Sequence, residues 1–325
     1  MARPRNIILL NETYRALAGQ FYEYLLRLGY HPKTSRSRYN YACEFLHWLE
    51  QRGELDITGI DGPAINQYYE YISSRPSLNP DRGSGGGALS LKTTHSHLRN
   101  VRDLFEMLLS QGRIRSNPAS TLYFPYPRER PERAVLTQGE IQGLYAACET
   151  ARERAILSLA YGCGLRAGEL ERCNIGDIRL REKLLVVPRG KGLKRRVVPM
   201  SAGVVKDLSD YYYNERETLT HGCDYNPRDT AFMLHSRGGR MHKWTYNKYL
   251  KRIIKRTELV LSEAEAKAIR EKEITIHNLR HSIATHLVEQ GVAVEQVRQF
   301  LGHSQLETTQ IYTHISRKVL QKLMR

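Results

Sequence analysis

The sequence predicts a mainly α-helical, two-domain protein with one small antiparallel β-sheet, an α+β fold. Apolar residues recur at helical spacing along most of the 325-residue chain. A segment rich in proline and arginine, residues 123–134, interrupts this pattern, because proline prevents regular helix. Two short apolar runs, residues 184–187 and 195–199, then flank the segment RGKGLK as the strands of a hairpin do. We therefore expect a helical domain over residues 1–122, a linker over 123–134, and a second domain with the sheet over 135–325.

The charge of the chain indicates an anionic partner. Fifty lysines and arginines stand against 34 aspartates and glutamates, a net charge of +16. Such an excess is typical of proteins that bind nucleic acid. No apolar run reaches the roughly 18 residues that a membrane helix needs, so we expect a cytoplasmic protein with no membrane partner. The five cysteines include no CxxC pair, and we expect them to be reduced structural thiols.

Four helices are expected in the first domain. Apolar residues at helical spacing place them over residues 13–28, from Thr34 onward, over 60–72 and over 90–111. Between the last two lies a segment, residues 75–90, with two prolines and four glycines, which is typical of a flexible loop.

Basic side chains gather on two of these helices. Arg36 and Arg38 lie near the start of the second helix, where a cation does not offset the helix dipole, and this placement favours a phosphate nearby. Lys92, His95 and Arg99 lie on the fourth helix, away from its apolar stripe. We expect these five residues to contact DNA, although any single one of them is more often a solvated surface charge.

The second domain begins with a capping box made by Thr137 and Glu140. A helix over residues 153–161 should end at two glycines, after which Arg166 and Glu169 begin the next turn. The hairpin tip then carries Lys191 and Lys194, and Arg195 begins the second strand. We expect Lys194 and Arg195 to contact DNA and Lys191 to reach outward from the tip.

Later elements of this domain are also expected from their patterns. Residues 230–234 are expected to add a third strand, residues 244–254 a helix surrounded by basic residues, and residues 262–272 a charged surface helix. Lys243, at the start of the second of these elements, is a further expected DNA contact.

Residues 274–315 hold the densest group of candidate functional side chains. Leu279, Ile283 and Leu287 repeat at helical spacing, so His277 and Arg280 share one helix face near its start. A second short helix should end at Gly302, directly before His303. Tyr312 then lies late in a third helix, or just past it.

Five motifs in this order resemble those of the tyrosine recombinases, the family of phage integrases and Xer-like bacterial recombinases: GLRAGEL, RGKGLKRRVVP, HNLRHSIATHL, LGHS and IYTH. One such motif is a weak signal, but five collinear ones are specific. The resemblance covers nearly all of residues 135–315, and the first domain looks like the SAM-like helical core-binding domain of that family. By similarity, the two catalytic arginines are Arg166 and Arg280, the hairpin lysine is Lys191, the two histidines are His277 and His303, and the nucleophile is Tyr312. Glu169 matches the family's acidic residue three positions after the first arginine.

The chemistry of these side chains is consistent with that assignment. A tyrosine with a pKa of about 10 is roughly one part in a thousand ionised at pH 7, so activating it must overcome about 4 kcal/mol. Two arginines can bind the oxygens of a phosphodiester and stabilise the charge of its transition state. A lysine can donate a proton to the departing 5′ oxygen, and a histidine can accept the proton of the tyrosine. This set requires neither a metal nor another cofactor, and HExxH is absent from the sequence.

The reaction that these residues imply is site-specific recombination through a 3′-phosphotyrosyl intermediate and a Holliday junction. Exchange of four strands requires four protomers, so we expect a homotetramer on double-stranded DNA with paired inverted-repeat sites. Accessory proteins are further candidate partners. Two alternatives use part of the same evidence: a type IB topoisomerase shares the nucleophile and arginines, and a non-catalytic sequence-specific DNA-binding protein shares the positive charge.

Overall fold

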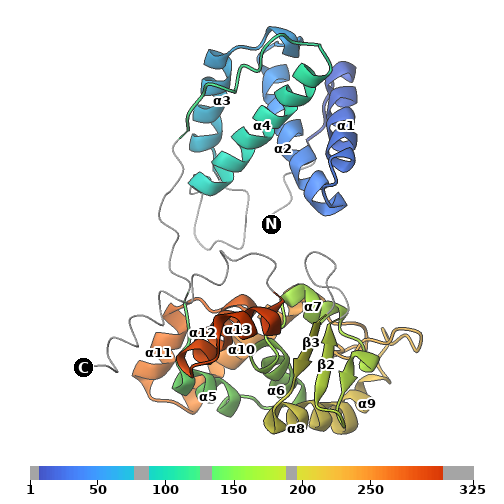
Figure 1. The fold of residues 1–325 in the computed structure, drawn as a ribbon, viewed down its shortest axis with the longest axis vertical. Helices are drawn as coiled ribbons and strands as arrows, with labels where there is room; N and C mark the ends of the chain where they lie inside the picture. The colour runs from blue at the N-terminus through green and yellow to red at the C-terminus, as the bar shows by residue number, and fades with distance from the viewer. Residues whose placement is uncertain (1–6, 77–87, 125–133, 188–195, 303–325) are drawn as a thin grey trace. The chain divides into compact units, whose positions relative to one another are not determined.

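The structure is a computed structural model, and the chain divides into two compact units, Met1–Pro131 and Glu132–Arg325 (Figure 1). The residues that it describes are 7–76, 88–124, 134–187 and 196–302. The described residues are mostly helical with one small antiparallel sheet, so the predicted fold class is confirmed. No helix in these ranges is both long and apolar enough to cross a membrane.

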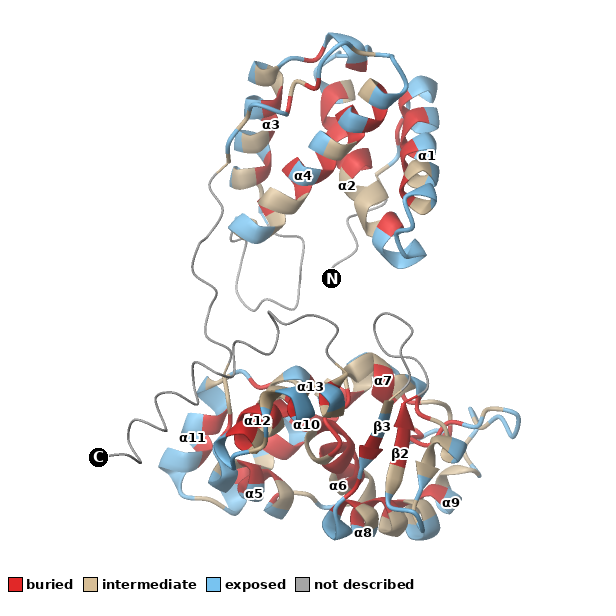
Figure 2. Cartoon of the chain, in the orientation of Figure 1, coloured by how far each residue is buried: buried red, intermediate tan, exposed pale blue. Residues whose placement is uncertain are grey.

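The described part of the first unit contains the four predicted α-helices: α1 Glu12–Arg27, α2 Pro32–Gln51, α3 Gly62–Ser74 and α4 Leu91–Ser110. A 3₁₀ turn, η1 Ile57–Gly59, precedes α3. Each α-helix starts after a side chain that accepts a backbone N–H of the first turn, namely Asn11, His31, Asp61 and Ser90. The apolar faces meet around buried aromatic rings, among them Phe45, Tyr68 and Phe105 (Figure 2). The predicted loop falls largely on residues 77–87, outside the described residues.

The described helices of the second unit are α5 Gln138–Ala146, α6 Ala151–Leu157, α7 Ala167–Arg172, α8 Ala202–Asp210, α9 Arg216–Leu219, α10 Lys243–Arg256, α11 Glu263–Glu271, α12 Ile276–Glu289 and α13 Val294–Leu301. Two π-helical segments, η2 Ser158–Gly162 and η4 Tyr211–Glu215, continue α6 and α8, and two 3₁₀ turns are η3 Ile175–Asp177 and η5 Thr257–Leu259. The predicted capping box of Thr137 and Glu140 starts α5. One large apolar core joins the sheet to most of these helices, and a smaller cluster joins α12 to α13 (Figure 2).

The sheet has three short antiparallel strands in the order β1-β2-β3: β1 Ile178–Arg179, β2 Leu184–Val187 and β3 Arg196–Pro199. In Figure 1 it lies at one side of the second unit, while α5, α11 and α12 lie at the other. The predicted hairpin strands pair in register, with Leu185 opposite Val198 and Val187 opposite Arg196. The two strands therefore bring both ends of residues 188–195 to one place.

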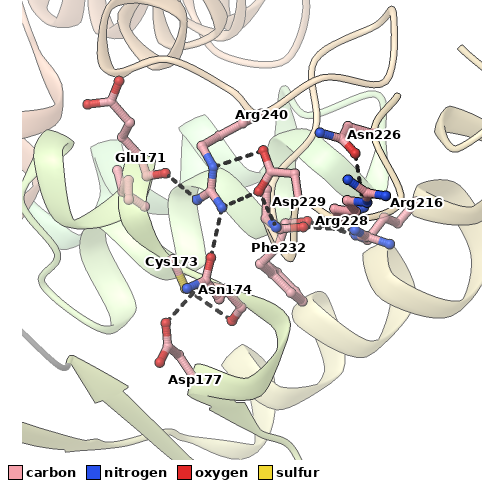
Figure 3. Close-up of polar contacts among 12 residues, drawn as sticks. Glu171, Cys173, Asn174, Asp177, Arg216, Asn226, Arg228, Asp229, Phe232 and Arg240 are labelled. Carbon is pink, nitrogen blue, oxygen red and sulfur yellow. Dashed lines mark hydrogen bonds and ion pairs between the residues drawn. The ribbon is translucent and has the colours of Figure 1, made fainter. Parts of the chain in front are cut away.

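The prediction of a third strand over residues 230–234 is wrong, because β1 takes that position instead. Residues 231–234 are all buried, so the segment has no solvent-facing side, and its pairing is limited to isolated bridges. Two of its backbone oxygens bind a side chain instead of a neighbouring strand. Arg216 donates to the carbonyl oxygens of Ala231 (2.8 Å) and Phe232 (3.0 Å), a contact drawn in Figure 3.

Candidate active site

The carboxylate of Glu169 is buried in the second unit, where its side chain is 2% exposed. Three guanidinium groups surround it. Arg166 lies 2.8 Å from Oε1, Arg196 donates to both carboxylate oxygens at 3.0 and 2.8 Å, and Arg280 lies 3.7 Å from Oε2. These residues come from α7 or its N-cap, β3 and α12, so the fold gathers in one place charges that are far apart in the sequence. We call this group the arginine centre.

The local sequence explains how Arg166 and Glu169 meet. Gly164 has a φ of +60°, which a side chain disfavours, and it turns the chain out of η2 toward α7. Arg166 is the N-cap of α7, and its backbone N–H donates to the Glu169 carboxylate at 3.0 Å. The same carboxylate therefore caps the helix and pairs with the arginine side chain.

Helix α12 contributes Arg280, which is buried and donates to the backbone oxygens of Gly164 and Leu301. His277 lies one turn earlier on the same helix, at an exposed position. The helix that was predicted to carry both residues is thus present, with Arg280 buried and His277, three positions earlier, exposed.

The C-terminal end of α13 is fastened to the arginine centre. Its last carbonyl oxygens, and the one that follows, each accept from a different arginine: Phe300 from Arg196, Leu301 from Arg280 and Gly302 from Arg166. Cations at a helix C-terminus also stabilise the helix dipole. Gly302 has a φ of +65°, and a Cβ there would lie 2.9 Å from the Arg196 side chain. The chain therefore needs glycine immediately before His303.

The arginine centre carries excess positive charge. Burial alone would raise the pKa of Glu169, but hydrogen bonds and the charges of Arg196 and Arg280, with the backbone of Arg166, lower it to about 2. Glu169 is therefore ionised at neutral pH. Its ion pairs within the described residues set three positive charges against this one negative charge, an excess of two, which an anion is suited to neutralise.

Arg196 is the residue of this centre that sequence reasoning missed. Its neighbour Arg195 was singled out instead, since both belong to one basic run. The strand pattern holds the missing signal, because alternate residues of a strand face the same side. Arg196 is two residues from buried Val198, so it faces inward, while exposed Val197 faces outward.

Several predicted site residues lie outside the described residues: Lys191, Lys194, Arg195, His303 and Tyr312. The structure does describe residues that flank them in the sequence. Val187 and Arg196 pair on either side of the segment that holds Lys191, and the oxygen of Gly302 accepts from Arg166. The described ranges contain no group of three or more His, Cys, Asp or Glu side chains that is arranged to hold a metal.

The predicted DNA contacts of the first unit differ in exposure. Arg36, Lys92 and Arg99 are exposed, and His95 is half-buried. Arg38 is turned inward: its side chain is 11% exposed, donates to Asn100 at 2.7 Å and pairs with Asp103. The positive charge of Arg38 is thus neutralised by Asp103 within the fold.

Lys243, the remaining predicted contact, is half-buried at the start of α10. Its ammonium lies 4.3 Å from the ring centre of Trp244, a residue that is 63% exposed. Proteins that bind nucleic acid use such surfaces, in which a cation stacks on an exposed aromatic ring.

A second arginine network in this unit has balanced charge (Figure 3). Arg240 pairs with Asp229, with Nε 3.1 Å from Oδ2, and also donates to the oxygen of Glu171 and to Asn174, each at 2.8 Å. One cation thus meets one carboxylate. The network fastens the segment that contains Asp229 and Arg240 to the end of α7, and we call it the Arg240 network.

Comparison with known proteins identifies the family. Residues 134–318 match the model of the phage integrase family. The chain is 30% identical over 300 residues to tyrosine recombinase XerC 2 of Ralstonia nicotianae, covering 91% of this chain and 80% of that protein. It is 31% identical over 304 residues to tyrosine recombinase XerD of Pseudomonas aeruginosa, covering 92% of each.

Solved structures share the fold. The Tn1549 transposon integrase in complex with transposon right end DNA superposes with a TM-score of 0.67 at 17% identity, covering 95% of this chain and 99% of that one. A lambda integrase dimer bound to a core site gives a TM-score of 0.63 at 18% identity, covering 92% and 94%. The family match spans more than half of the chain, and the relatives match nearly all of it. This chain therefore belongs to the phage integrase family of tyrosine recombinases.

Proposed function

We propose that this protein is a site-specific DNA recombinase that cuts and rejoins DNA strands through Tyr312. The observation that carries the proposal is the arginine centre, where Arg166, Arg196 and Arg280 surround the single carboxylate of Glu169. A phosphodiester, and still more its transition state, supplies the negative charge that this site lacks.

The proposed roles follow from exposure. Arg166 has the most accessible of the three guanidinium groups, with 24% of its side chain exposed against 5% for Arg280 and 8% for Arg196. We assign Arg166 and Arg280 to the non-bridging oxygens of the scissile phosphate. Arg196 instead holds Glu169 and the end of α13 in place. Glu169 fixes the arginine rotamers and stays ionised.

Proton transfer falls to the remaining residues of the set. His277 and His303 are assigned to hydrogen bonds with the phosphate or to acceptance of the Tyr312 proton. Lys191 is assigned to protonate the departing 5′ oxygen. The products are a 3′-phosphotyrosyl bond and a free 5′ hydroxyl. Because the new ester conserves the energy of the broken one, the hydroxyl of another strand can reverse the step without ATP.

The DNA and the assembly are proposed from the same reaction. Four active sites are needed to exchange four strands, so we propose a homotetramer on paired inverted-repeat sites, with accessory proteins as further partners. The first unit, through Arg36, Lys92, His95 and Arg99, is proposed to hold the duplex as a core-binding domain over residues 1–122. We place the reaction in the cytoplasm, where bacterial DNA lies.

A suicide substrate tests the proposal. Nicked duplex carrying sequence from beside the gene is incubated with wild type or with Tyr312→Phe, and the products are separated on a denaturing gel. We expect a protease-sensitive DNA–protein adduct with wild type alone, and product topology then separates recombination from relaxation. Equal adduct with both proteins would refute the assignment of Tyr312. Tight, salt-sensitive binding without any adduct would favour a non-catalytic DNA-binding protein.

A further inference from the structure

One face of α12 binds the backbone where the predicted linker ends and the second domain begins. Three of its side chains, spaced four residues apart, contact residues 134–136. Asn278 donates through Nδ2 to the oxygen of Ala134 at 3.0 Å. Ser282 accepts the N–H of Leu136 at 2.9 Å, and His286 lies 2.9 Å from the oxygen of the same residue. Positions i, i+4 and i+8 form one line along a helix, so these contacts run down a single stripe.

His286 also contacts η2 through its second ring nitrogen. Its Nε2 faces a carbonyl oxygen, which accepts but cannot donate, so Nε2 carries the hydrogen. Nδ1 therefore accepts from the hydroxyl of Tyr161 at 2.8 Å. Tyr161 lies in η2, five residues before Arg166, and the turn at Cys163 and Gly164 connects the two. The stripe thus lies on the helix that carries Arg280 and contacts the segment that leads to Arg166.

The contacts begin beside the catalytic side chains of α12. Asn278 is next in sequence to His277, and its Oδ1 accepts the N–H and the hydroxyl of Thr275 at 3.0 and 2.6 Å, which caps the helix. One amide group therefore holds both the start of the catalytic helix and Ala134. Lys272 adds a further tie, donating to the oxygen of Val135 at 3.2 Å.

We propose that Asn278, Ser282 and His286 form a latch that holds the chain leaving the linker against α12 and so positions Arg280 and His277 for cleavage. These are positioning residues, and none is assigned to touch DNA. The inference rests on the proposed function. Its consequence is that the attachment of the first unit, through residues that end at Ala134, influences the geometry of the cleavage site.

The magnitude of the effect follows from the rigidity of α12. The helix has 14 residues, about 21 Å, and its hydrogen bonds make it move as one body. A shift of about 1 Å in a reacting group can cost on the order of 100-fold in rate. Release of the latch is therefore expected to slow the chemical step while the surfaces that bind DNA stay intact.

The test is a two-by-two comparison in the full chain. The latch is released by Asn278→Asp with Ser282→Ala. The aspartate keeps an oxygen for the Thr275 cap but sets a carboxylate against the oxygen of Ala134. The attachment is loosened separately by a short Gly-Ser insertion after Pro131. The single-turnover rate of covalent adduct formation is measured on the suicide substrate with saturating protein, and DNA affinity is measured by titration.

We expect each change alone to slow adduct formation about tenfold, with DNA affinity changed less than about twofold. Together they should slow it little more than either alone, because both interrupt the same connection and contacting sites are not additive. Thr257→Ala is the control for stability. It removes a buried hydrogen bond to Ile254 in the same unit and should leave the rate unchanged.

Two results would overturn the latch while leaving the proposed function standing: losses that multiply to about 100-fold in the combined protein, or an insertion without effect in wild type. A loss of rate in Thr257→Ala equal to that of the latch variant would also overturn it, because general destabilisation would then suffice. Absence of adduct in wild type would instead overturn the proposed function, and this inference with it.

Discussion

Two arginine networks in the second unit use the same kinds of atoms but differ in charge balance. In the Arg240 network, one guanidinium meets the carboxylate of Asp229, and its other donors go to neutral oxygens. In the arginine centre, three guanidinium groups share the carboxylate of Glu169. Both networks join segments that are distant in sequence, so joining segments does not distinguish a functional site from a structural one.

The two networks differ in net charge. The Arg240 network is neutral, and it contributes to the fold without any further partner. The arginine centre holds an excess of two positive charges, in a place that also secures the residue before His303. Uncompensated buried charge is costly, and its retention is typical of sites that bind the opposite charge. The comparison identifies charge excess, more than burial or hydrogen bonding, as the mark of the site.

The largest expected effect comes from removing one arginine of each network. Arg280→Ala should reduce adduct formation on the order of 1000-fold, because a lost donor to transition-state charge typically costs 100- to 1000-fold or more. Arg240→Ala should reduce stability but change the cleavage rate of the folded protein less than about threefold, since only structural contacts are lost. Single-turnover kinetics and thermal unfolding of both variants check this. Similar losses of rate would remove the distinction between the networks.

Neutralising the carboxylate of each network should lower the free energy of unfolding by different amounts. Glu169→Gln leaves three guanidinium groups without their counter-charge, and breaking a buried pair costs about 3 to 5 kcal/mol. Asp229→Asn should cost about 1 kcal/mol, because Asp229 and Arg240 are more than a quarter exposed and solvent screens the pair. Denaturant unfolding measures both values. A smaller loss for Glu169→Gln than for Asp229→Asn would contradict the assigned charge excess.

Glu169 should contribute to the pH dependence of stability. Its pKa is about 2 in the folded protein against an ordinary value of 4.5, so its contribution is present above pH 4.5 and is lost as the pH falls toward 2. This amounts to roughly 3 kcal/mol across that interval. Unfolding curves between pH 6 and pH 2.5 should show the decline in wild type and a shallower one in Glu169→Gln. Identical slopes would exclude Glu169 as its source.

A glycine pair offers a smaller and sharper contrast. Gly302 and Gly291 both have positive φ, but a Cβ at Gly302 would meet Arg196 whereas nothing lies within 4 Å at Gly291. Both alanine variants should lose about 1 kcal/mol from backbone strain. Only Gly302→Ala should also slow adduct formation, by about tenfold, through displacement of the arginine centre. Equal kinetics for Gly302→Ala and Gly291→Ala would show that Arg196 tolerates the intrusion.

The smallest expected effect extends the contrast to the first unit, where Arg99 is exposed and Arg38 is paired with Asp103. Arg99→Ala should weaken DNA binding a few-fold and reduce the slope of log affinity against log salt by about 1, the signature of one phosphate contact. Arg38→Ala should lower the stability of this unit and leave the salt slope unchanged. A reduced slope in Arg38→Ala would place that side chain on DNA instead.

Periodicity and capping patterns predicted the elements that carry the site. The apolar repeat through Leu279 predicted one helix for His277 and Arg280, and the glycines before Arg166 predicted a new helical turn that begins with Arg166 and Glu169. Helices α12 and α7 have these forms. Such predictions succeed because the interactions are local, within about one helical turn.

Interactions between distant segments escaped prediction. Arg196 joins Glu169 across 27 residues, and Arg38 joins Asp103 across 65, so no local pattern records either partner. Residues 230–234 were mistaken for a strand because an apolar run indicates burial without telling which group takes its backbone hydrogen bonds. In the structure, the side chain of Arg216 in α9 takes two of them.

The central claim, that the charge excess of the arginine centre binds the scissile phosphate, is tested most directly by removing charge from the phosphate. Wild type, Arg280→Ala and Arg240→Ala are compared on suicide substrates with either a phosphate or a neutral methylphosphonate at the cleavage position. We expect the deficit of Arg280→Ala to shrink from about 1000-fold on phosphate to less than about tenfold on methylphosphonate, with Arg240→Ala near wild type on both. An equal loss of cleavage rate in Arg280→Ala on the two substrates would contradict the claim. The contribution of the arginine would then not depend on the negative charge of the phosphate.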